Sequence, residues 1–276
     1  MAPLTPRNGY EANKTLISSI YNSFENHLPH KVKHTIKSII EKELSVHDHI
    51  NVFFRADDIG VQSINFSRMM SLFLKYRIPL CLAVVPAWIT ESRWKAMDGF
   101  IKKGKDLFCW HMHGYRHINH EAQGKKQEFG PARSNLELAN DLSRGHERLK
   151  SIMGKMLTPV FTPPWNRCSL ATMNRLKIIG FKGVSRSYGS LPLPPKGFKD
   201  FSVHVDLHTR KEKLAEQGWQ KLMEEFTRGM DSSACGIMIH HMRMNDQAFI
   251  FLESLLELLT AYKKINFVTF NDLTVS

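Results

Sequence analysis

Short apolar runs alternate with longer amphipathic stretches along most of this 276-residue chain. The apolar runs have the length of β-strands, and they fall at residues 50–54, 79–85, 107–110, 159–161, 181–184, 201–205, 236–239 and 265–270. Stretches with a helical repeat of apolar positions separate most of them, at residues 61–76, 87–102, 135–153, 169–179, 214–230 and 247–262. This alternation predicts a parallel sheet covered by helices. Seven or eight such units favour a closed α/β barrel, in which chemistry belongs at the carboxyl ends of the strands.

The first 48 residues show a different pattern. Two groups of apolar residues recur at helical spacing: Leu16, Ile17, Ile20, Tyr21 and Phe24, then Val32, Ile36, Ile39, Ile40 and Leu44. Residues 27–30 contain Pro29 and predict a break between the two helices. We therefore divide the chain into an N-terminal helical extension, residues 1–48, and a barrel domain, residues 49–276.

The second of these helices is amphipathic and basic. It carries Lys31, Lys33, Lys37 and Lys42. Such a helix can make peripheral contact with an anionic membrane face. Glu41 and Glu43 dilute the positive charge, which favours a helix packed on the barrel with its lysines in water.

Composition narrows the class of protein. The chain is 42% hydrophobic and 23% charged, as globular proteins are. It has 38 Lys and Arg against 26 Asp and Glu, a net charge of +12 that favours anionic partners such as phosphates, acidic glycans or an anionic membrane. No module typical of nucleic-acid binding occurs, so we predict no nucleic-acid partner. No pattern predicts an oligomeric state.

Compartment and thiol chemistry follow from what the sequence contains. No apolar run reaches the roughly 18 residues of a membrane span, and the polar start has no secretory core. These features predict a cytoplasmic protein. The four cysteines are far apart and form no C-x-x-C pair, so we predict buried structural thiols in place of disulfides or a cysteine-rich zinc site.

Polar residues gather where the predicted strands end. Asp57 and Asp58 follow the first strand, and neighbouring buried carboxylates are costly unless a cation holds them. Further clusters follow later strands, at residues 110–120, 161–166 and 239–241. Two polar loops, residues 119–133 and 188–199, could border a substrate cleft or be ordinary connections.

The histidines of the second cluster indicate a metal. His113 and His117 are four residues apart, a spacing that puts both imidazoles on one face of a helical turn. With one carboxylate they would form a His₂–Asp site with open positions, which suits Zn²⁺ or a related divalent ion. His111 and His120 are competing ligands in the same cluster.

Together these motifs resemble the polysaccharide deacetylase superfamily (NodB homology, carbohydrate esterase family 4). The resemblance covers residues 50–270, and the matching motifs are Asp57-Asp58, His113-Gly114-Tyr115-Arg116-His117, Thr162-Pro163-Pro164-Trp165 and Ile239-His240. It implies a distorted (β/α)₇ barrel and a metal-dependent hydrolase that removes an N-acetyl group from a sugar.

The resemblance also implies roles for individual residues. Asp57 would be the general base and His240 the general acid. Asp58, His113 and His117 would hold the divalent metal ion, most simply zinc. Pro164, Trp165 and Tyr115 would bind substrate, and the backbone N–H near Trp165 would help bind the oxyanion.

The sequence departs from the family pattern at three points. Thr162 stands where the family has the arginine that orients the base, and Arg55 is our first candidate to replace it, ahead of Arg167. His241 follows His240, and we favour His240 as the acid. The tryptophan-containing motif that supports the acid is not evident, which leaves Asp206 and Asp246 as candidates for that role.

The predicted substrate is an N-acetylated glycan intermediate inside the cell, linked to a lipid or to a nucleotide, because both linkages carry phosphate. Two alternatives stay open. One is a glycoside hydrolase that uses two carboxylates, although the adjacent Asp57 and Asp58 should point apart. The other is a non-catalytic glycan-binding protein that retains the deacetylase fold.

Overall fold

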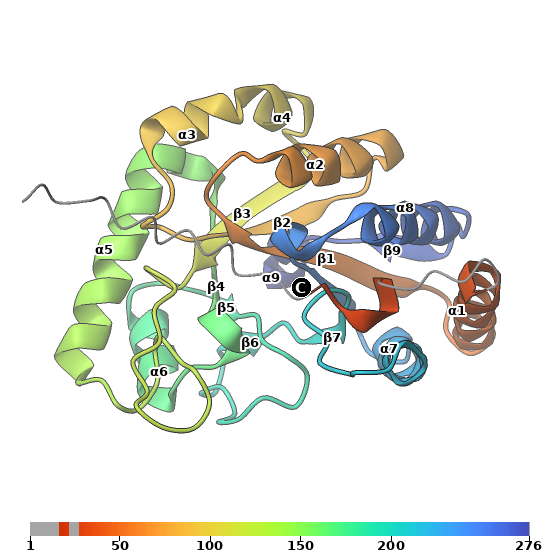
Figure 1. Cartoon of the computed structure of the whole chain (residues 1–276). Helices are drawn as coiled ribbons and strands as arrows, with labels where there is room; N and C mark the ends of the chain where they lie inside the picture. Colours follow the sequence, from red (N-terminus) through yellow and green to blue (C-terminus); the bar gives the residue numbers. More distant parts are fainter. Residues whose placement is uncertain (1–16, 22–27, 276) are drawn as a thin grey trace, which may run out of the picture.

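The structure, a computed structural model, describes residues 17–21 and 28–275. It is built on nine parallel strands: β1 (Ile50–Ile59), β2 (Leu80–Val84), β3 (Phe108–His113), β4 (Leu157–Thr162), β5 (Gly183–Val184), β6 (Lys199–Asp200), β7 (Val203–Asp206), β8 (Cys235–Ile239) and β9 (Ile265–Phe267). Eight of them follow the order β6-β5-β4-β3-β2-β1-β8-β7, and β9 pairs with β1. The strands curl around a common axis, as Figure 1 shows.

The two ends of this sheet meet through the chain that follows β5. The N–H of Phe201 donates to the carbonyl of Val184, and the N–H of Val203 donates to the carbonyl of Arg186. Since β6 and β7 are consecutive pieces of one segment, the ring has seven strand positions. The prediction of a distorted (β/α)₇ barrel is confirmed.

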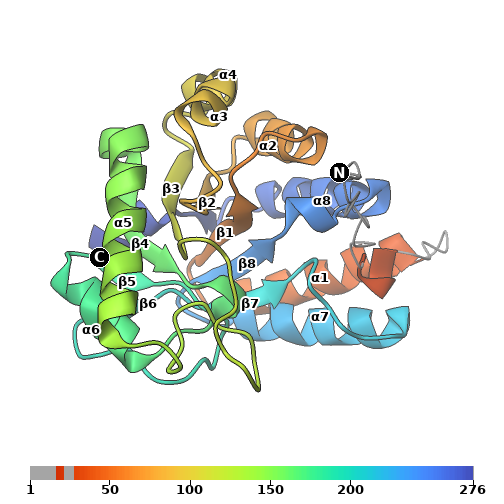
Figure 2. The ribbon, with the colours of Figure 1, turned by 60° about the vertical axis from the view of Figure 1, so that its left-hand side comes forward.

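Helices surround this ring. They are α1 (Leu28–Leu44), α2 (Ile64–Tyr76), α3 (Glu91–Ala96), α4 (Asp98–Lys103), α5 (Asn135–Met153), α6 (Leu170–Ile178), α7 (Ala215–Met230), α8 (Asp246–Thr260) and α9 (Phe270–Val275). Figure 2 shows α5 and α6 on one side of the barrel and α1, α7 and α8 on the other. Polar side chains start several helices: Ser63 caps α2, Ser134 and Glu137 form a capping box on α5, and Asn245 caps α8.

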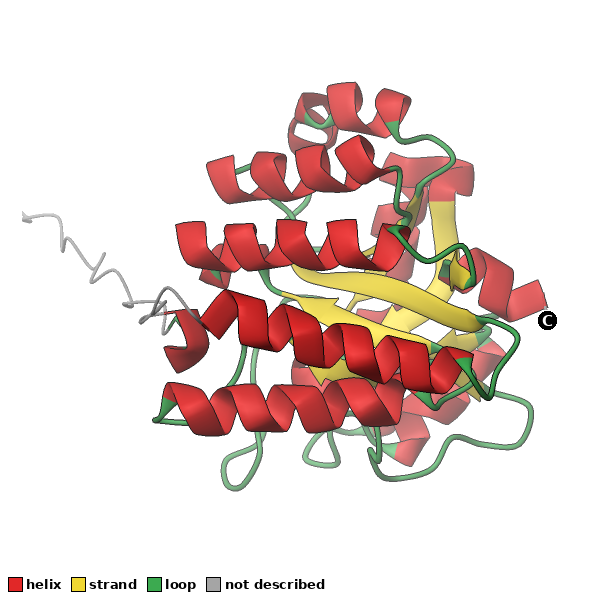
Figure 3. Cartoon of the chain, turned by 90° about the vertical axis from the view of Figure 1, so that its right-hand side faces the viewer, coloured by secondary structure: helices red, strands yellow, loops and turns green. Residues whose placement is uncertain are grey.

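The N-terminal helix α1 takes a place in the outer ring. It packs between α7 and α8, and Figure 3 shows these helices side by side. Val32, Ile36 and Ile40 are buried there, while the lysines Lys31, Lys33, Lys37 and Lys42 are exposed. The packed arrangement that we favoured for this helix is therefore what the structure shows. The apolar stripe of the helix lies against the barrel domain and is not available to a membrane.

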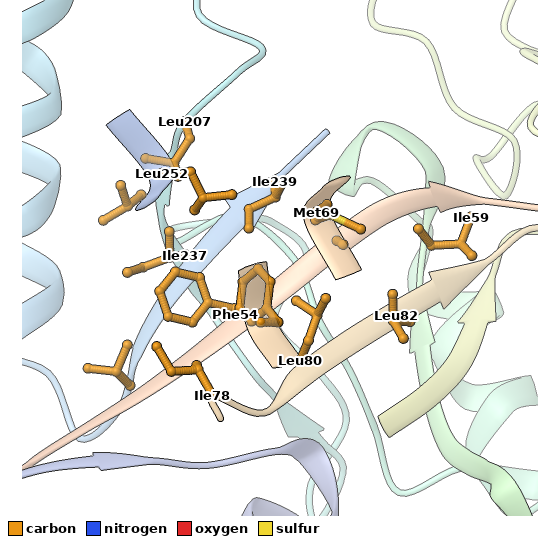
Figure 4. Close-up of a cluster of buried hydrophobic side chains, with 14 of the residues drawn as sticks. Phe54, Ile59, Met69, Ile78, Leu80, Leu82, Leu207, Ile237, Ile239 and Leu252 are labelled. Carbon is orange, nitrogen blue, oxygen red and sulfur yellow. The ribbon is translucent and has the colours of Figure 1, made fainter. Parts of the chain in front are cut away.

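Two hydrophobic layers stabilise the barrel. Successive side chains of β1 point to opposite faces of the sheet, so this strand contributes to both layers. Phe54 and Ala56 belong to the layer that faces the helices, and Figure 4 shows Phe54 there among side chains of β1, β2, β8, α2 and α8. Phe53 faces the barrel axis and packs on Phe270 of α9. The centroids of the two rings are 5.3 Å apart. The four cysteines are free and buried.

Some predicted boundaries were wrong. The helix expected over residues 87–102 is two short helices, because Thr90 caps a new start at Glu91 and the chain bends at Met97. The strand expected over residues 265–270 ends at Phe267, where Thr269 bonds to the Asp272 carboxylate and α9 begins.

At the N-terminus, α1 begins at Leu28, inside the break predicted for residues 27–30. Of the helix predicted from Leu16 to Phe24, the structure describes residues 17–21, which form a short 3-10 helix at Ser19–Tyr21; the other positions lie outside the described residues. None of the helices described here has the length and apolar character needed to cross a lipid bilayer.

Candidate active site

Asp57 and Asp58 lie in the last part of β1, which runs further than the sequence predicts. The pairing with β2 shifts between Ala56 and Ile59, and Asp58 adopts a left-handed backbone with φ of 62°. This irregularity turns both carboxylates into one cleft, where each has an oxygen 3.9–4.0 Å from Nε2 of His240. The expectation that the two side chains point apart was therefore wrong.

Arg55 orients Asp57 from two residues earlier on the same strand. Its Nε and Nη2 donate to Oδ1 and Oδ2 of Asp57, each at 2.8 Å. Arg55 is fully buried, and it also donates to Ser185 and to Oδ1 of Asn166. Burial raises the pKa of Asp57, but Arg55, with His113 and His240, outweighs it and lowers that pKa below its ordinary value.

Thr162, in the place of the family arginine, has a different partner. Its hydroxyl lies 2.9 Å from Nε2 of His111 inside the barrel. Burial and the charge of Arg55 lower the pKa of His111 to about 3, so this histidine is neutral. His111 belongs to the interior packing, and Arg55 supplies the guanidinium that Thr162 lacks.

Asp58, His113 and His117 converge on one point. Nε2 of His113 and Nε2 of His117 each lie 3.3 Å from Oδ1 of Asp58, and all three ligand atoms are within 4.8 Å of one another. Nδ1 of His113 donates to the carbonyl of Thr162, which leaves Nε2 facing the site. His120, the other competing ligand, is exposed and outside this group.

These residues fit a divalent cation. Oδ1 of Asp58 is buried and has no hydrogen-bond partner among the described residues. Ligands at 2.0–2.1 Å from a tetrahedral zinc are about 3.4 Å apart, close to the two spacings of 3.3 Å. Burial opposes the charge of Asp58, yet the nearby histidines, His113 first and then His240 and His117, hold its pKa well below the usual range. Burial and the charge of His113 lower the pKa of His117 to about 4, which leaves its imidazole neutral.

The connection between the two histidines is a turn and not the helical turn that we predicted. His113 ends β3, and Gly114 and His117 have φ of 56° and 61°. Glu128 holds this turn, because its buried carboxylate accepts the N–H groups of Tyr115, Arg116 and His117 at 3.1, 2.6 and 3.1 Å. Sequence reasoning missed Glu128, which lies in a polar loop with no motif to mark it.

Two tryptophans flank His117. The ring of Trp165 is 4.6 Å from that of His117, and the ring of Trp88 is 5.7 Å away on a tilted plane. Trp165 and Asn166 both have left-handed backbones, and both line the cleft. Trp88 and Asn166 were not predicted as site residues.

Pro164 and Tyr115 are not brought into the cleft. Pro164 is buried against Gly114, where a Cβ would come within 2.5 Å of its ring. Tyr115 packs toward Gly145 of α5, and neither residue is in the lining of the cleft. Both shape the turn that carries His117 from behind.

His240 lies in the cleft, whereas His241 faces the core. The His241 ring packs edge-on against Phe66, and burial lowers the pKa of His241 to about 4. Neither suggested supporting carboxylate reaches His240: Asp246 is paired with Arg68 on the surface, and Asp206 accepts the N–H groups of His208 and Thr209. Nδ1 of His240 is buried and has no hydrogen-bond partner in the described part of the chain.

Comparison with known proteins rests on structure. No family model matches the sequence, and no curated protein is similar to it in sequence. Many solved structures share its fold, including polysaccharide deacetylases. A family 4 acetyl xylan esterase from Clostridium thermocellum, with a bound cobalt ion, aligns over 82% of this chain and 90% of its own, with 12% identity and a TM-score of 0.53. The chain has the fold of the polysaccharide deacetylases.

That fold serves more than one purpose. The allantoinase PuuE aligns over 82% of this chain and 89% of its own, with 12% identity and a TM-score of 0.59. A family 4 pseudoenzyme from Bacillus anthracis aligns over 82% of this chain and 66% of its own, with 12% identity and a TM-score of 0.51. The fold therefore does not determine the activity of this chain, which depends on the residues in its own cleft.

Proposed function

We propose that this protein is a metal-dependent carbohydrate N-deacetylase. One observation carries the proposal: an unpartnered carboxylate oxygen of Asp58 faces two imidazole nitrogens, beside a second carboxylate clamped by Arg55 and faced by His240. This arrangement places a cation site, a base and an acid in one cleft.

The chain's own groups divide the work of amide hydrolysis. Asp58, His113 and His117 would hold a divalent ion, zinc in our proposal, and such an ion polarises a carbonyl and acidifies water. Asp57 takes the proton of the attacking water. Arg55 keeps Asp57 ionised and fixes its orientation, so that a free carboxylate oxygen lone pair faces the cleft.

His240 acts on the other side of the scissile bond. It donates a proton to the amine nitrogen, because an unprotonated amine leaves poorly. The backbone N–H of Trp165 stabilises the oxyanion, an effect worth about 3–4 kcal/mol for a well-placed donor. The Trp165 ring forms a wall of the cleft against which a sugar ring can stack.

The substrate that we propose is an N-acetylated sugar of an intracellular intermediate, linked to a lipid or a nucleotide. The net charge of +12 supports an anionic substrate. Four free, buried cysteines are in keeping with a cytoplasmic setting, where thiols stay reduced.

The proposal is tested by acetate release from a panel of N-acetylated sugars, measured by mass spectrometry as the loss of one acetyl group. We expect release by the zinc-loaded protein and a loss of at least about 1,000-fold for Asp57→Asn. A glycoside hydrolase would instead retain its activity after chelation. If wild type and Asp57→Asn are equally silent on every sugar while a sugar still binds, the protein is a glycan-binding protein.

A further inference from the structure

The cleft at the metal centre has a second, basic part. The cleft has a volume of about 860 Å³ and reaches the loop that follows β7. Four cationic side chains are among the residues that line the cleft, and we call them the basic lobe: Arg167 after β4, Lys211 and Lys213 in the loop after β7, and Arg243 after β8. A volume of this size accommodates a sugar together with a further charged group.

The cations of the basic lobe have no carboxylate partner. Arg210 and Lys221 also line the cleft, but Glu225 lies 2.8 Å from Arg210 and Glu212 lies 2.9 Å from Lys221. No ion pair joins any member of the basic lobe to a carboxylate within the described residues.

The carboxylates of the cleft are already committed. Asp57 is clamped by Arg55, Asp58 belongs to the cation site, and Asp206 accepts two backbone N–H groups. The four cations of the lobe thus have no ion-pair partner among the residues that the structure describes, and they line the same cleft as the cation site.

The N-terminal segment holds the loop of the lobe in place. The hydroxyl of Ser18 donates to the carbonyl of His208 at 2.8 Å, and that of Ser19 donates to the carbonyl of Glu212 at 2.7 Å. Glu212 lies between Lys211 and Lys213. Ile17 and Ser19 themselves line the cleft, so residues outside the barrel domain build one wall of it.

This segment is anchored tightly. Ile20 is fully buried, and a Cβ on Gly218 of α7 would come within 2.6 Å of its side chain. Tyr21 is buried among the rings of His208, Trp219 and Phe251. A loop fixed at both ends presents its lysines at defined positions, which favours a specific ligand over a diffuse basic surface.

We propose that the basic lobe binds a phosphate group esterified to the sugar whose acetamide lies at the metal centre. The inference rests on the proposed function for the position of the sugar. Two arginines offer planar forks and two lysines offer point charges, a set that suits the several oxygens and the double charge of a phosphate monoester or a diphosphate. A nucleotide-linked and a lipid-linked sugar share this chemistry.

Binding is measured by calorimetry in the Asp57→Asn variant, so that no turnover is required. The probes are N-acetylglucosamine, its 1-phosphate, its uridine diphosphate ester, and its diphosphate on a prenyl chain in neutral phosphatidylcholine vesicles. We expect the phosphorylated probes to bind at least tenfold more tightly than the free sugar. Lys211→Ala/Lys213→Ala should remove at least tenfold of that affinity and change free-sugar binding less than twofold.

A matched control removes the same charge elsewhere. Lys263 and Lys264 are exposed and precede β9, at the opposite end of the barrel from the cleft, so Lys263→Ala/Lys264→Ala should leave every affinity unchanged. Gly218→Ala, which displaces Ile20 without touching the lobe, should weaken phosphorylated probes in the same direction as the lysine variant.

The outcomes separate this inference from the proposed function. Tight binding of the soluble esters indicates a nucleotide-linked ligand, and binding of the prenyl probe alone indicates a lipid-linked one; both support the lobe. Equal affinity for free and phosphorylated sugar, or no loss in the lysine variant, overturns it even if acetate is released. Phosphate-dependent binding without acetate release by the wild type would leave the lobe standing and remove the deacetylase.

Discussion

Arg55 and Asp57 show how a single strand can supply both a base and the group that orients it. Two positions apart on β1, their side chains point to the same interior, and the guanidinium meets the carboxylate through two hydrogen bonds of 2.8 Å. The sequence suggested Arg55 as the substitute for the arginine missing at Thr162. Its partners Asn166 and Ser185 could not be predicted, because they are more than 100 residues away along the chain.

Moving the arginine tests this relation. Arg55→Met should lower kcat by about 100-fold or more and destabilise the fold by about 3–5 kcal/mol, since Asp57 is left buried without its partner. Adding Thr162→Arg on β4, where the Thr162 side chain also lies inside the barrel, should restore at least tenfold of the lost kcat. Thr162→Arg alone, with both guanidinium groups present, should give no gain in kcat over the wild type and should overpack the core. Failure of the double variant to recover any activity, while folded, would contradict the positioning role.

The metal site makes a prediction for two histidines. His113→Ala and His117→Ala should each weaken zinc binding by more than about 100-fold, since loss of a ligand exceeds the 10–100-fold typical of outer-shell changes. Metal titration by calorimetry and the far-ultraviolet circular dichroism of each variant provide the measurements. His120→Ala is the matched control and should bind zinc as the wild type does. Full zinc occupancy in both ligand variants would remove the assignment.

At the scale of elements, the turn from β3 to His117 depends on one carboxylate from a distant part of its loop. Glu128 accepts the N–H groups of three successive residues. These hydrogen bonds stabilise a turn in which Gly114 and His117 both have a left-handed backbone. The sequence placed both histidines in the site but gave them a helical turn. Spacing alone cannot distinguish a helical turn from a turn held by a side chain elsewhere.

Glu128→Ala should therefore act on metal binding as well as on stability. Three partly buried N–H groups lose a charged acceptor, at about 1–3 kcal/mol each, and His117 loses its fixed position. We expect a fall in zinc affinity of about tenfold or more, measured by calorimetry, and a lower urea midpoint. Glu137→Ala is the control, because Glu137 is an exposed residue of the capping box at the start of α5. Its loss should lower the free energy of unfolding by about 1 kcal/mol and leave zinc affinity unchanged.

At the scale of the whole molecule, the strand and helix periodicity was enough to predict the barrel, because seven repeated units leave few ways to bury so many apolar strands. The closure of the ring was not predictable. It depends on irregular pairing between residues 184–188 and 201–203, and the apolar runs at 181–184 and 201–205 do not indicate which strands pair. The same holds for β1, where the irregularity that turns Asp58 inward has no signature in the sequence.

Buried histidines distributed over the barrel predict acid sensitivity. Burial lowers the pKa of His111 to about 3 and the pKa of His204 and His241 to about 4, and it holds the pKa of His208 well below its ordinary value. Below about pH 6.5 these histidines bind protons in the unfolded chain but not in the folded one. The free energy of unfolding therefore falls as the pH drops toward 4. Each such histidine contributes up to about 1.4 kcal/mol per pH unit in that window.

Urea unfolding at pH 7.5, 6.0 and 5.0 measures this slope. His204→Asn removes one of these groups, since an amide oxygen can accept the N–H of Gly236 as Nδ1 does, and it should make the slope shallower. His34→Asn, at an exposed position of α1, should leave it unchanged. A free energy of unfolding that is flat from pH 7.5 to 5.0 would contradict the prediction.

The place of α1 between α7 and α8 has a consequence for the order in which the chain is made. This helix precedes every strand of the barrel, yet its two neighbours are synthesised much later, α7 from Ala215 and α8 up to Thr260. At roughly 5–20 residues per second, about 10–40 s separate its synthesis from that of α8. Until α7 and α8 have been synthesised, the apolar side chains of Val32, Ile36 and Ile40 lack the helices that cover them in the folded protein.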